Sequence, residues 1–249
     1  MYNDAIASYN TLRDSWYSPI HVIRGFHFLG QRYGDNINKS EFKKAKEMFV
    51  ASVALLGAYE FSPENKYFLQ LNKQSATPDV MAGMQTEQKG AGILLELMQM
   101  EITEFEEHFP VDDIIEFLKM TKLSSKKRYG DKTAIVCMVN RKLPFNNKLI
   151  SEKIKILNPS STVYIVGRVH GEAPTKFVIF SPFPNLTKPV KYDIAETANK
   201  YHIPPRVKFH ISNANKIQYE QFNSDPENVY TMFDIDEMKV ENKYKHGKN

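Results

Sequence analysis

The chain has 249 residues, of which 42% are hydrophobic and 25% are charged, and its formal net charge at pH 7 is +4. This composition is typical of a globular protein and excludes an intrinsically disordered one. No run of about 18 apolar residues is present, so no membrane span is predicted. The opening stretch MYNDAIASYNTLRDSWYSP lacks a basic head followed by an apolar core, so no secretory signal is predicted either.

The single cysteine, Cys137, lies in the apolar run TAIVCMV and is expected to be buried and inert. One cysteine cannot form an internal disulfide, and the count also excludes a zinc site built from several cysteines. These features together predict an intracellular, cytoplasmic protein. The modest positive charge permits nucleic-acid binding without requiring it.

The first half of the chain predicts one helix followed by three strands. Residues 1–38 are rich in aromatic residues and are expected to form an N-terminal arm of short helices. Residues 39–61 carry apolar side chains at helical spacing behind Ser40, a good N-cap. Strands are predicted at 66–71, 78–84 and 92–105. The last of these could also be a helix, but its second half alternates polar and apolar residues, which favours a strand.

The second half alternates helices with strands. Residues 133–141 form a nearly continuous apolar run, which is typical of a central strand covered on both faces. The remaining predicted elements are helices at 110–128, 146–157 and 193–203 and strands at 161–169, 176–183 and 206–212. The fold class that follows is α/β, with three layers and a mixed central β-sheet flanked by helices. This domain is expected to span 39–215, with a polar C-terminal segment at 216–249.

Two acidic residues lie on neighbouring predicted strands. Asp79 follows Pro78 at the start of the second strand, and Glu101 lies near the end of the third. This order of helix, three strands, helix and strand resembles the core of the PD-(D/E)xK nuclease superfamily, which has the restriction-endonuclease-like fold. The resemblance covers roughly residues 40–141. It implies that Asp79 and Glu101 are metal ligands, with the main-chain carbonyl of Ile102 as a further one.

The sequence departs from the family pattern at Thr103, where the resemblance places a lysine. Three interpretations remain open. Lys119 or Lys122 on the next helix, or less favourably Lys89, replaces the missing cation, and Lys119 is assigned here as the catalytic lysine. Alternatively, Gln99 and Glu101 together form the motif, with Glu101 in the lysine position. In the third interpretation catalysis is lost and a binding scaffold remains. Glu47 on the first helix is a further, weaker candidate.

The function implied by the resemblance is hydrolysis of DNA phosphodiester bonds by a metal-dependent endonuclease, and a restriction or defence role is consistent with it. Mg²⁺, or Mn²⁺ in its place, is the implied cofactor, because a cation held by carboxylates can neutralise a phosphate and activate water. Lys126, Lys127 and Arg128 are the predicted phosphate contacts, with Tyr129 able to stack on a base. A homodimer is a further possibility, because two strands must be cut.

Two alternatives belong to other classes. The chain could be a catalytically inactive, nuclease-like module that binds nucleic acid or protein. It could also be an unrelated α/β protein in which 92–105 is helical and the motif is accidental. The pattern GxxxxGK[ST] is absent, which argues against hydrolysis of ATP or GTP through a P-loop, and no GxSxG motif is present.

Overall fold

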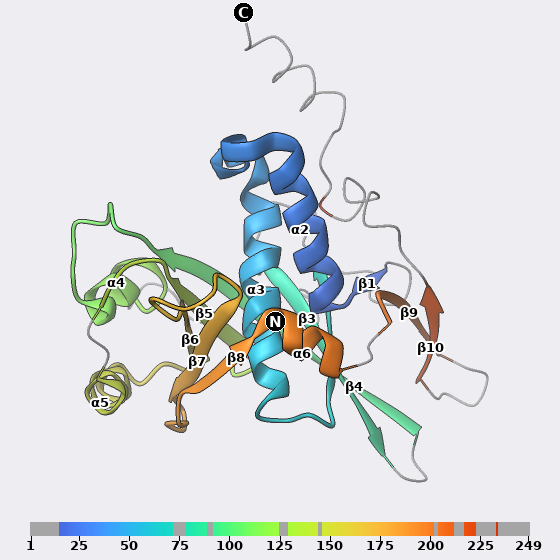
Figure 1. Cartoon of the computed structure of the whole chain (residues 1–249). Helices are drawn as coiled ribbons and strands as arrows, with labels where there is room; N and C mark the ends of the chain where they lie inside the picture. Colours follow the sequence, from blue (N-terminus) through green and yellow to red (C-terminus); the bar gives the residue numbers. More distant parts are fainter. Residues whose placement is uncertain are drawn as a thin grey trace, which may run out of the picture.

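A ten-stranded mixed sheet forms the centre of the molecule in the computed structural model (Figure 1). The structure describes residues 15–71, 78–88, 92–124, 129–143, 146–201, 204–211, 217–222 and 233. The strand order is β10-β9-β1-β2-β3-β4-β5-β6-β7-β8. The strands are β1 (Trp16–Tyr17), β2 (Lys66–Leu71), β3 (Val80–Gln88), β4 (Gly92–Phe105), β5 (Thr133–Val139), β6 (Thr162–Arg168), β7 (Lys176–Phe183), β8 (Val190–Asp193), β9 (Arg206–Ile211) and β10 (Ile217–Phe222).

Parallel pairing is confined to the middle of the sheet. β4, β5 and β6 run parallel to one another, whereas the other neighbouring strands are antiparallel. Parallel neighbours need a crossover connection, and helices supply it here. α4 (Ile114–Thr121) lies between β4 and β5 along the chain, and α5 (Asn147–Leu157) lies between β5 and β6.

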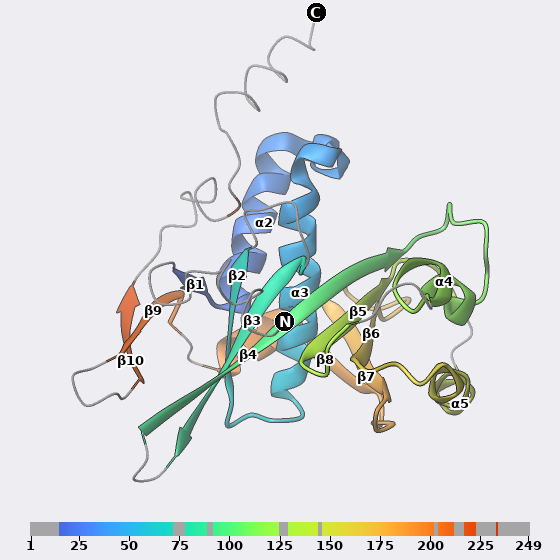
Figure 2. The same ribbon diagram turned by 180° about the vertical axis from the view of Figure 1, so that it is seen from behind.

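Helices cover both faces of the sheet. α2 (Pro19–Tyr33), α3 (Lys43–Tyr59) and α6 (Ile194–Lys200) pack on one face, and α4 and α5 pack on the other. Successive side chains of β5 point to opposite faces of the sheet and therefore belong to two different hydrophobic cores. Ala134, Val136 and Met138 belong to the α3 core, whereas Ile135 and Cys137 belong to the α4 and α5 core. The result is a three-layer α/β arrangement, with β4 running towards α4 (Figure 2).

Close packing of α3 against the sheet depends on a glycine. A Cβ atom at Gly57 would lie 2.6 Å from Ile179 Cγ2 and 2.9 Å from Tyr192 Cε1, too close for any other residue to fit without a shift. One turn earlier, Val53 O accepts a hydrogen bond of 2.6 Å from the Tyr192 hydroxyl. These contacts fix α3 over β7 and β8, and hence fix the position of its first turn near the end of β4.

The predicted elements agree with the structure in type, and the bounds differ at their ends. The strand predicted at 92–105 is confirmed as β4, and the central strand is confirmed as β5, whose seven residues are all buried. The helix predicted at 110–128 is shorter, because Asp113 caps its start and Lys122 ends it. The 3₁₀ turns Gly34–Asn38 and Ser40–Phe42 precede α3.

Three elements of the sheet lie outside the predicted set. β1 falls within the expected arm at 1–38, β8 follows β7, and β10 falls within the expected polar segment at 216–249. β1 pairs with β2 and β9, and β10 pairs with β9, so both predicted outer segments contribute to the same sheet as the predicted domain. Within the described ranges, no helix is long and apolar enough to cross a membrane.

Candidate functional site

The register of β3 and β4 brings Asp79 beside Glu101. Val80 at the start of β3 pairs with Met100, so one more step along each antiparallel strand reaches these two acids. Asp79 then accepts a hydrogen bond of 2.8 Å from Ile102 N–H to its Oδ2. Glu101 is 2% exposed, which is unusual for a carboxylate without a charged partner.

That partner is Lys122, at the end of α4. Its Nζ lies 2.7 Å from Glu101 Oε2 and 3.0 Å from Asp79 Oδ2. The lysine side chain is 13% exposed, so one ammonium joins the two carboxylates in a largely buried cluster. Its backbone N–H donates to Leu118 O at 2.9 Å, which fixes the point where the helix ends.

Electrostatic interactions keep this lysine charged. Burial lowers the pKa of Lys122, but attraction and hydrogen bonds from Asp79 and Glu101 outweigh burial, and the pKa is raised above its ordinary value. Lys122 is therefore a cation at neutral pH and occupies the position between the two carboxylates.

Tyr129 completes the surroundings of Glu101. Its phenol is hydrogen-bonded to Glu101, and its backbone carbonyl accepts a hydrogen bond from Ser160 Oγ. Burial, followed by the negative charge of Glu101, raises the pKa of Tyr129 to about 12. The tyrosine is therefore neutral at ordinary pH, and its hydroxyl can donate to the carboxylate.

Glu47 on α3 adds a third carboxylate to the neighbourhood. It is 6% exposed, and its pKa is raised by burial and then by the charge of Asp79. Lys44 Nζ lies 3.1 Å from Glu47 Oε2 and Lys43 Nζ lies 3.5 Å from Oε1. The Lys44 contact is an ion pair rather than a well-aligned hydrogen bond, and it leaves the buried Oε2 atom without a hydrogen-bond partner of good geometry.

The other predicted site residues lie elsewhere. Lys119, assigned from the sequence as the catalytic lysine, is exposed on α4, and Lys122 rather than Lys119 contacts the two acids. Thr103 is partly buried on β4. The predicted phosphate contacts Lys126, Lys127 and Arg128, and the alternative Lys89, lie outside the described residues.

The chemistry of this cluster fits a small divalent cation. In the part of the chain that the structure describes, no group of three or more His, Cys, Asp or Glu side chains is arranged to hold a metal ion. Mg²⁺ does not need such a group, because it commonly takes one or two carboxylates and completes its shell with waters and phosphate oxygens. Asp79 and Glu101 already converge on one cation, the Lys122 ammonium.

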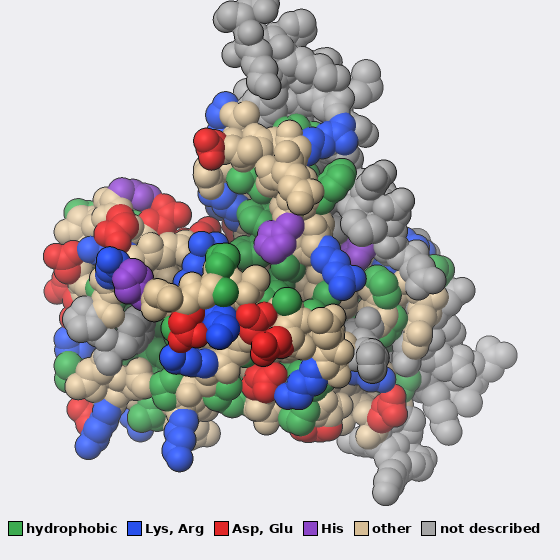
Figure 3. All heavy atoms as spheres, viewed as in Figure 1, with side chains coloured by type: hydrophobic (Ala, Val, Ile, Leu, Met, Phe, Trp, Pro, Cys, Tyr) green, Lys and Arg blue, Asp and Glu red, His purple; other side chains and the backbone are tan. Residues whose placement is uncertain are grey.

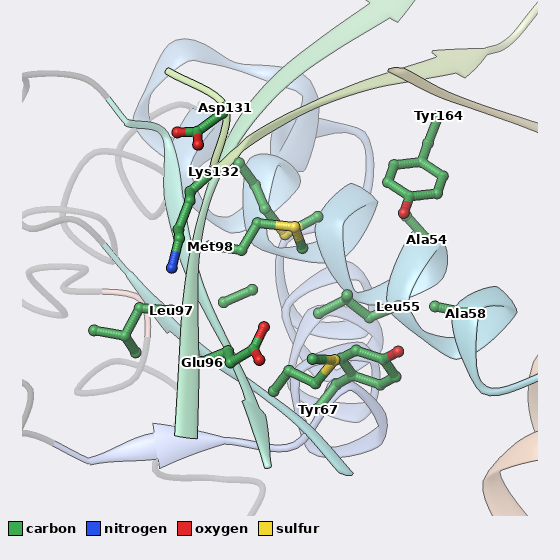
Figure 4. Close-up of a pocket in the computed structure, with 13 residues that line it drawn as sticks. Ala54, Leu55, Ala58, Tyr67, Glu96, Leu97, Met98, Asp131, Lys132 and Tyr164 are labelled. Carbon is green, nitrogen blue, oxygen red and sulfur yellow. The ribbon is translucent and has the colours of Figure 1, made fainter. Parts of the chain in front are cut away.

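Two cavities flank β4 on the side of α3. One, of about 320 Å³, is lined by Asn38, Lys39, Ser40, Lys43, Lys46, Glu47, Ile102, Thr103 and Glu104. The other, of about 270 Å³, is mainly apolar. Figure 4 shows Leu55 and Ala58 of α3 in this second cavity, together with Glu96 and Met98 of β4.

Many surface charges elsewhere are explained by ion pairs. Lys200 lies 3.1 Å from Glu60, and Lys191 lies 3.0 Å from Glu172. Figure 3 shows acidic and basic side chains intermingled over the part of this face where α6 and β8 lie. These charges form local pairs rather than a basic surface.

Comparison with protein-family models and with curated proteins identifies no relative. No protein-family model matches the sequence, and no curated protein is significantly similar to it.

Proposed function

We propose that this chain is a metal-dependent nuclease of the PD-(D/E)xK type that hydrolyses phosphodiester bonds in DNA. The observation that carries the proposal is the convergence of Asp79 and Glu101 on one cation within 3.0 Å. The order α3, β2, β3, β4, α4, β5 also agrees with the order that the resemblance implies. Lys122 supplies the positive charge that the sequence lacks at Thr103.

Three groups on the chain would hold the metal ion. Asp79 and Glu101 are the two carboxylate ligands. The carbonyl of Ile102 is the third, because the N–H and C=O of a strand residue point to the same side, and this N–H points to Asp79. A bound Mg²⁺ or Mn²⁺ would neutralise the scissile phosphate and lower the pKa of its bound water.

Lys122 and Tyr129 would act around these ligands. With the carboxylates holding a metal ion, the Lys122 ammonium would be available to hydrogen-bond to a phosphate oxygen or to the attacking water. Tyr129 holds Glu101 in place through its hydroxyl. Glu47 lies close enough to Asp79 for the charge of Asp79 to raise the pKa of Glu47.

Cleavage assays with matched variants test the proposal. Supercoiled plasmid and single-stranded DNA are incubated with wild type, Asp79→Ala and Glu101→Ala in Mg²⁺, Mn²⁺ or EDTA. We expect metal-dependent cutting by wild type and a loss of at least about 100-fold in each variant, equivalent to roughly 2.7 kcal/mol of transition-state stabilisation. The control is Glu107→Ala, an exposed acid on the same acidic run, which should cut like wild type.

Absence of cleavage by wild type would contradict the proposed nuclease activity. If folded wild type cuts neither substrate in any metal, hydrolysis is contradicted, and the chain is better described as the nuclease-like binding module that the sequence also allows. A restriction or defence role, and a homodimer, belong to the same proposal and depend on the cutting result.

A further inference from the structure

The polar cavity of about 320 Å³ lies at an open edge of β4. β3 pairs with β4 only as far as Met100, and among the described residues no other strand pairs with this side of β4 from Glu101 onward. Ile102 joins this edge to the carboxylate pair, since it lines the cavity and its N–H donates to Asp79. The cavity therefore lies next to the carboxylate pair along the strand edge, on the face that α3 covers, whereas the Glu101 side chain points to the opposite face, where Lys122 of α4 contacts it.

Three lysines lie at the mouth of this cavity. Lys39, Lys43 and Lys46 line it, and Lys46 Nζ donates to Asn38 O at 3.5 Å. The first turn of α3 holds no acidic residue. Lysines at the start of a helix face the positive end of its dipole, an unfavourable arrangement that a bound anion would reverse.

The remaining lining restricts the kind of anion. Asn38 and Ser40 offer hydrogen bonds, and none of the lining residues is aromatic, so a nucleobase would find no ring on which to stack. The volume lies at the lower end of the range for ligand sites. A phosphate group with its sugar fits this chemistry, whereas a base pair does not.

Two carboxylates also reach the cavity. Glu47 lies beside Lys43 and Lys44, and Glu104 accepts a hydrogen bond of 3.1 Å from Asn140 Nδ2. These acids weaken the attraction for a free anion. A phosphate within a nucleic-acid strand is also held in place by contacts of the neighbouring nucleotides, so it can still occupy the cavity.

We propose that this cavity binds the backbone phosphate next to the scissile one on a nucleic-acid strand that lies along the open edge of β4. The proposal rests on the proposed function, because the carboxylate pair defines which phosphate is scissile. Contacts confined to phosphate and sugar carry no sequence information, so binding at this cavity is independent of sequence.

Binding without cleavage tests the cavity separately from catalysis. The probes are two fluorescein-labelled single-stranded 12-mers of different sequence, followed by fluorescence anisotropy in EDTA and in Ca²⁺ across a range of salt. The variant is Lys39→Gln/Lys43→Gln/Lys46→Gln. The matched control, Lys148→Gln/Lys155→Gln/Lys188→Gln, removes the same charge from exposed positions on α5 and the β7–β8 connection.

We expect the cavity variant to bind both 12-mers at least about tenfold more weakly at low salt. Its plot of log K against log salt should be less steep by about 0.7 for each phosphate that the variant no longer neutralises. The control variant should stay within about twofold of wild type. If the triple variant does not fold, Lys43→Gln alone serves, because the Lys43 side chain is 73% exposed and its replacement is tolerated.

Several results would overturn the assignment. These are no binding by wild type, equal binding by wild type and the cavity variant, or an equal loss in the cavity and control variants. Each differs from a failure of the proposed function. Binding that depends on these lysines, without any cleavage, would contradict the nuclease proposal and support the phosphate-binding cavity. Cleavage that is unchanged in the cavity variant would support the nuclease proposal and contradict the cavity assignment.

Discussion

Lys122 Nζ lies 2.7 Å from Glu101 Oε2, although the two residues are 21 positions apart and belong to different layers of the fold. Glu101 comes from β4, and Lys122 ends α4. A buried carboxylate without a partner would lose its charge or destabilise the fold. The lysine therefore has a structural role, because it gives the buried Glu101 carboxylate a partner of opposite charge.

Removing this lysine should destabilise the protein in a way that a divalent cation corrects. Lys122→Met keeps the side-chain length but leaves two carboxylates close together, and we expect a loss of about 3 kcal/mol. Adding Mn²⁺ should raise the melting temperature of Lys122→Met more than that of wild type. Thermal unfolding with and without Mn²⁺ measures this. Lys119→Met, on the exposed face of the same helix, is the control and should match wild type; equal behaviour of the two variants would refute the role of Lys122.

A lysine placed on β4 should replace Lys122 in part. Thr103 lies two residues beyond Glu101, so both side chains lie on the same face of the strand. We expect Lys122→Met to lose cleavage and Lys122→Met/Thr103→Lys to regain at least about tenfold in rate, equivalent to roughly 1.4 kcal/mol. Single-turnover cleavage rates give the comparison. A double variant no faster than Lys122→Met would show that the position of the ammonium on α4 is essential.

Cys137 should be unreactive in the folded protein. It is fully buried in β5, and burial raises the pKa of its thiol well above the ordinary value. The thiolate is the reactive form, so a thiol reagent at pH 8 should modify no cysteine until denaturant is added, and one thereafter. Absorbance of the released chromophore counts the thiols. Rapid reaction under native conditions would mean that β5 opens readily.

Asp113 should stabilise α4 in a pH-dependent manner. Its side chain caps the helix through Ile115 N–H at 2.6 Å and lies 2.8 Å from Lys153 Nζ. The Lys153 hydrogen bond, followed by the backbone bonds, lowers the pKa of Asp113 below its ordinary 3.8. A lowered folded-state pKa means that the stabilisation is present above the unfolded value and disappears as pH falls through the folded one.

Urea unfolding of Asp113→Ala and wild type measures this effect. We expect a loss of about 1 kcal/mol at pH 7, mostly from the cap because the exposed ion pair is screened by solvent. The difference should shrink below about pH 3.8. Asp113→Asn, which keeps a capping oxygen without the charge, should be less damaging. A difference that is constant with pH would contradict the charge contribution.

Much of the fold follows from local patterns in the sequence. The unbroken apolar run of β5 predicts a strand buried on both faces, and the alternation at the end of β4 distinguishes it from a helix. α2 is harder to predict because Gly25 and Gly30 interrupt its apolar pattern, although Ser18 and Pro19 give the usual signals of a helix start. β1 has only two residues, and it exists because β2 and β9 lie on either side of it.

The candidate site is only partly predictable. Asp79 and Glu101 can be chosen from strand order, but the choice between Lys119 and Lys122 needs the helix face. The buried face of α4 is formed by Ile114, Ile115, Phe117 and Leu118, and on a helical wheel Lys122 lies closer to the centre of that face than Lys119 does. This signal was present in the sequence. The Tyr129 contact with Glu101 and the burial of Glu47 depend on tertiary packing and have no local signal.

Exchange of the Lys122 ammonium for a divalent cation is the step on which the proposed function depends. Titration of Mn²⁺ followed by electron paramagnetic resonance measures it directly in wild type, Glu101→Gln, Asp79→Asn and Lys122→Met. We predict one Mn²⁺ per wild-type chain, weaker binding by at least about tenfold in both carboxylate variants, and tighter binding in Lys122→Met because the competing ammonium is gone. Equal Mn²⁺ binding by wild type and Glu101→Gln, or no Mn²⁺ binding by any of the four proteins, would contradict a metal site at Asp79 and Glu101.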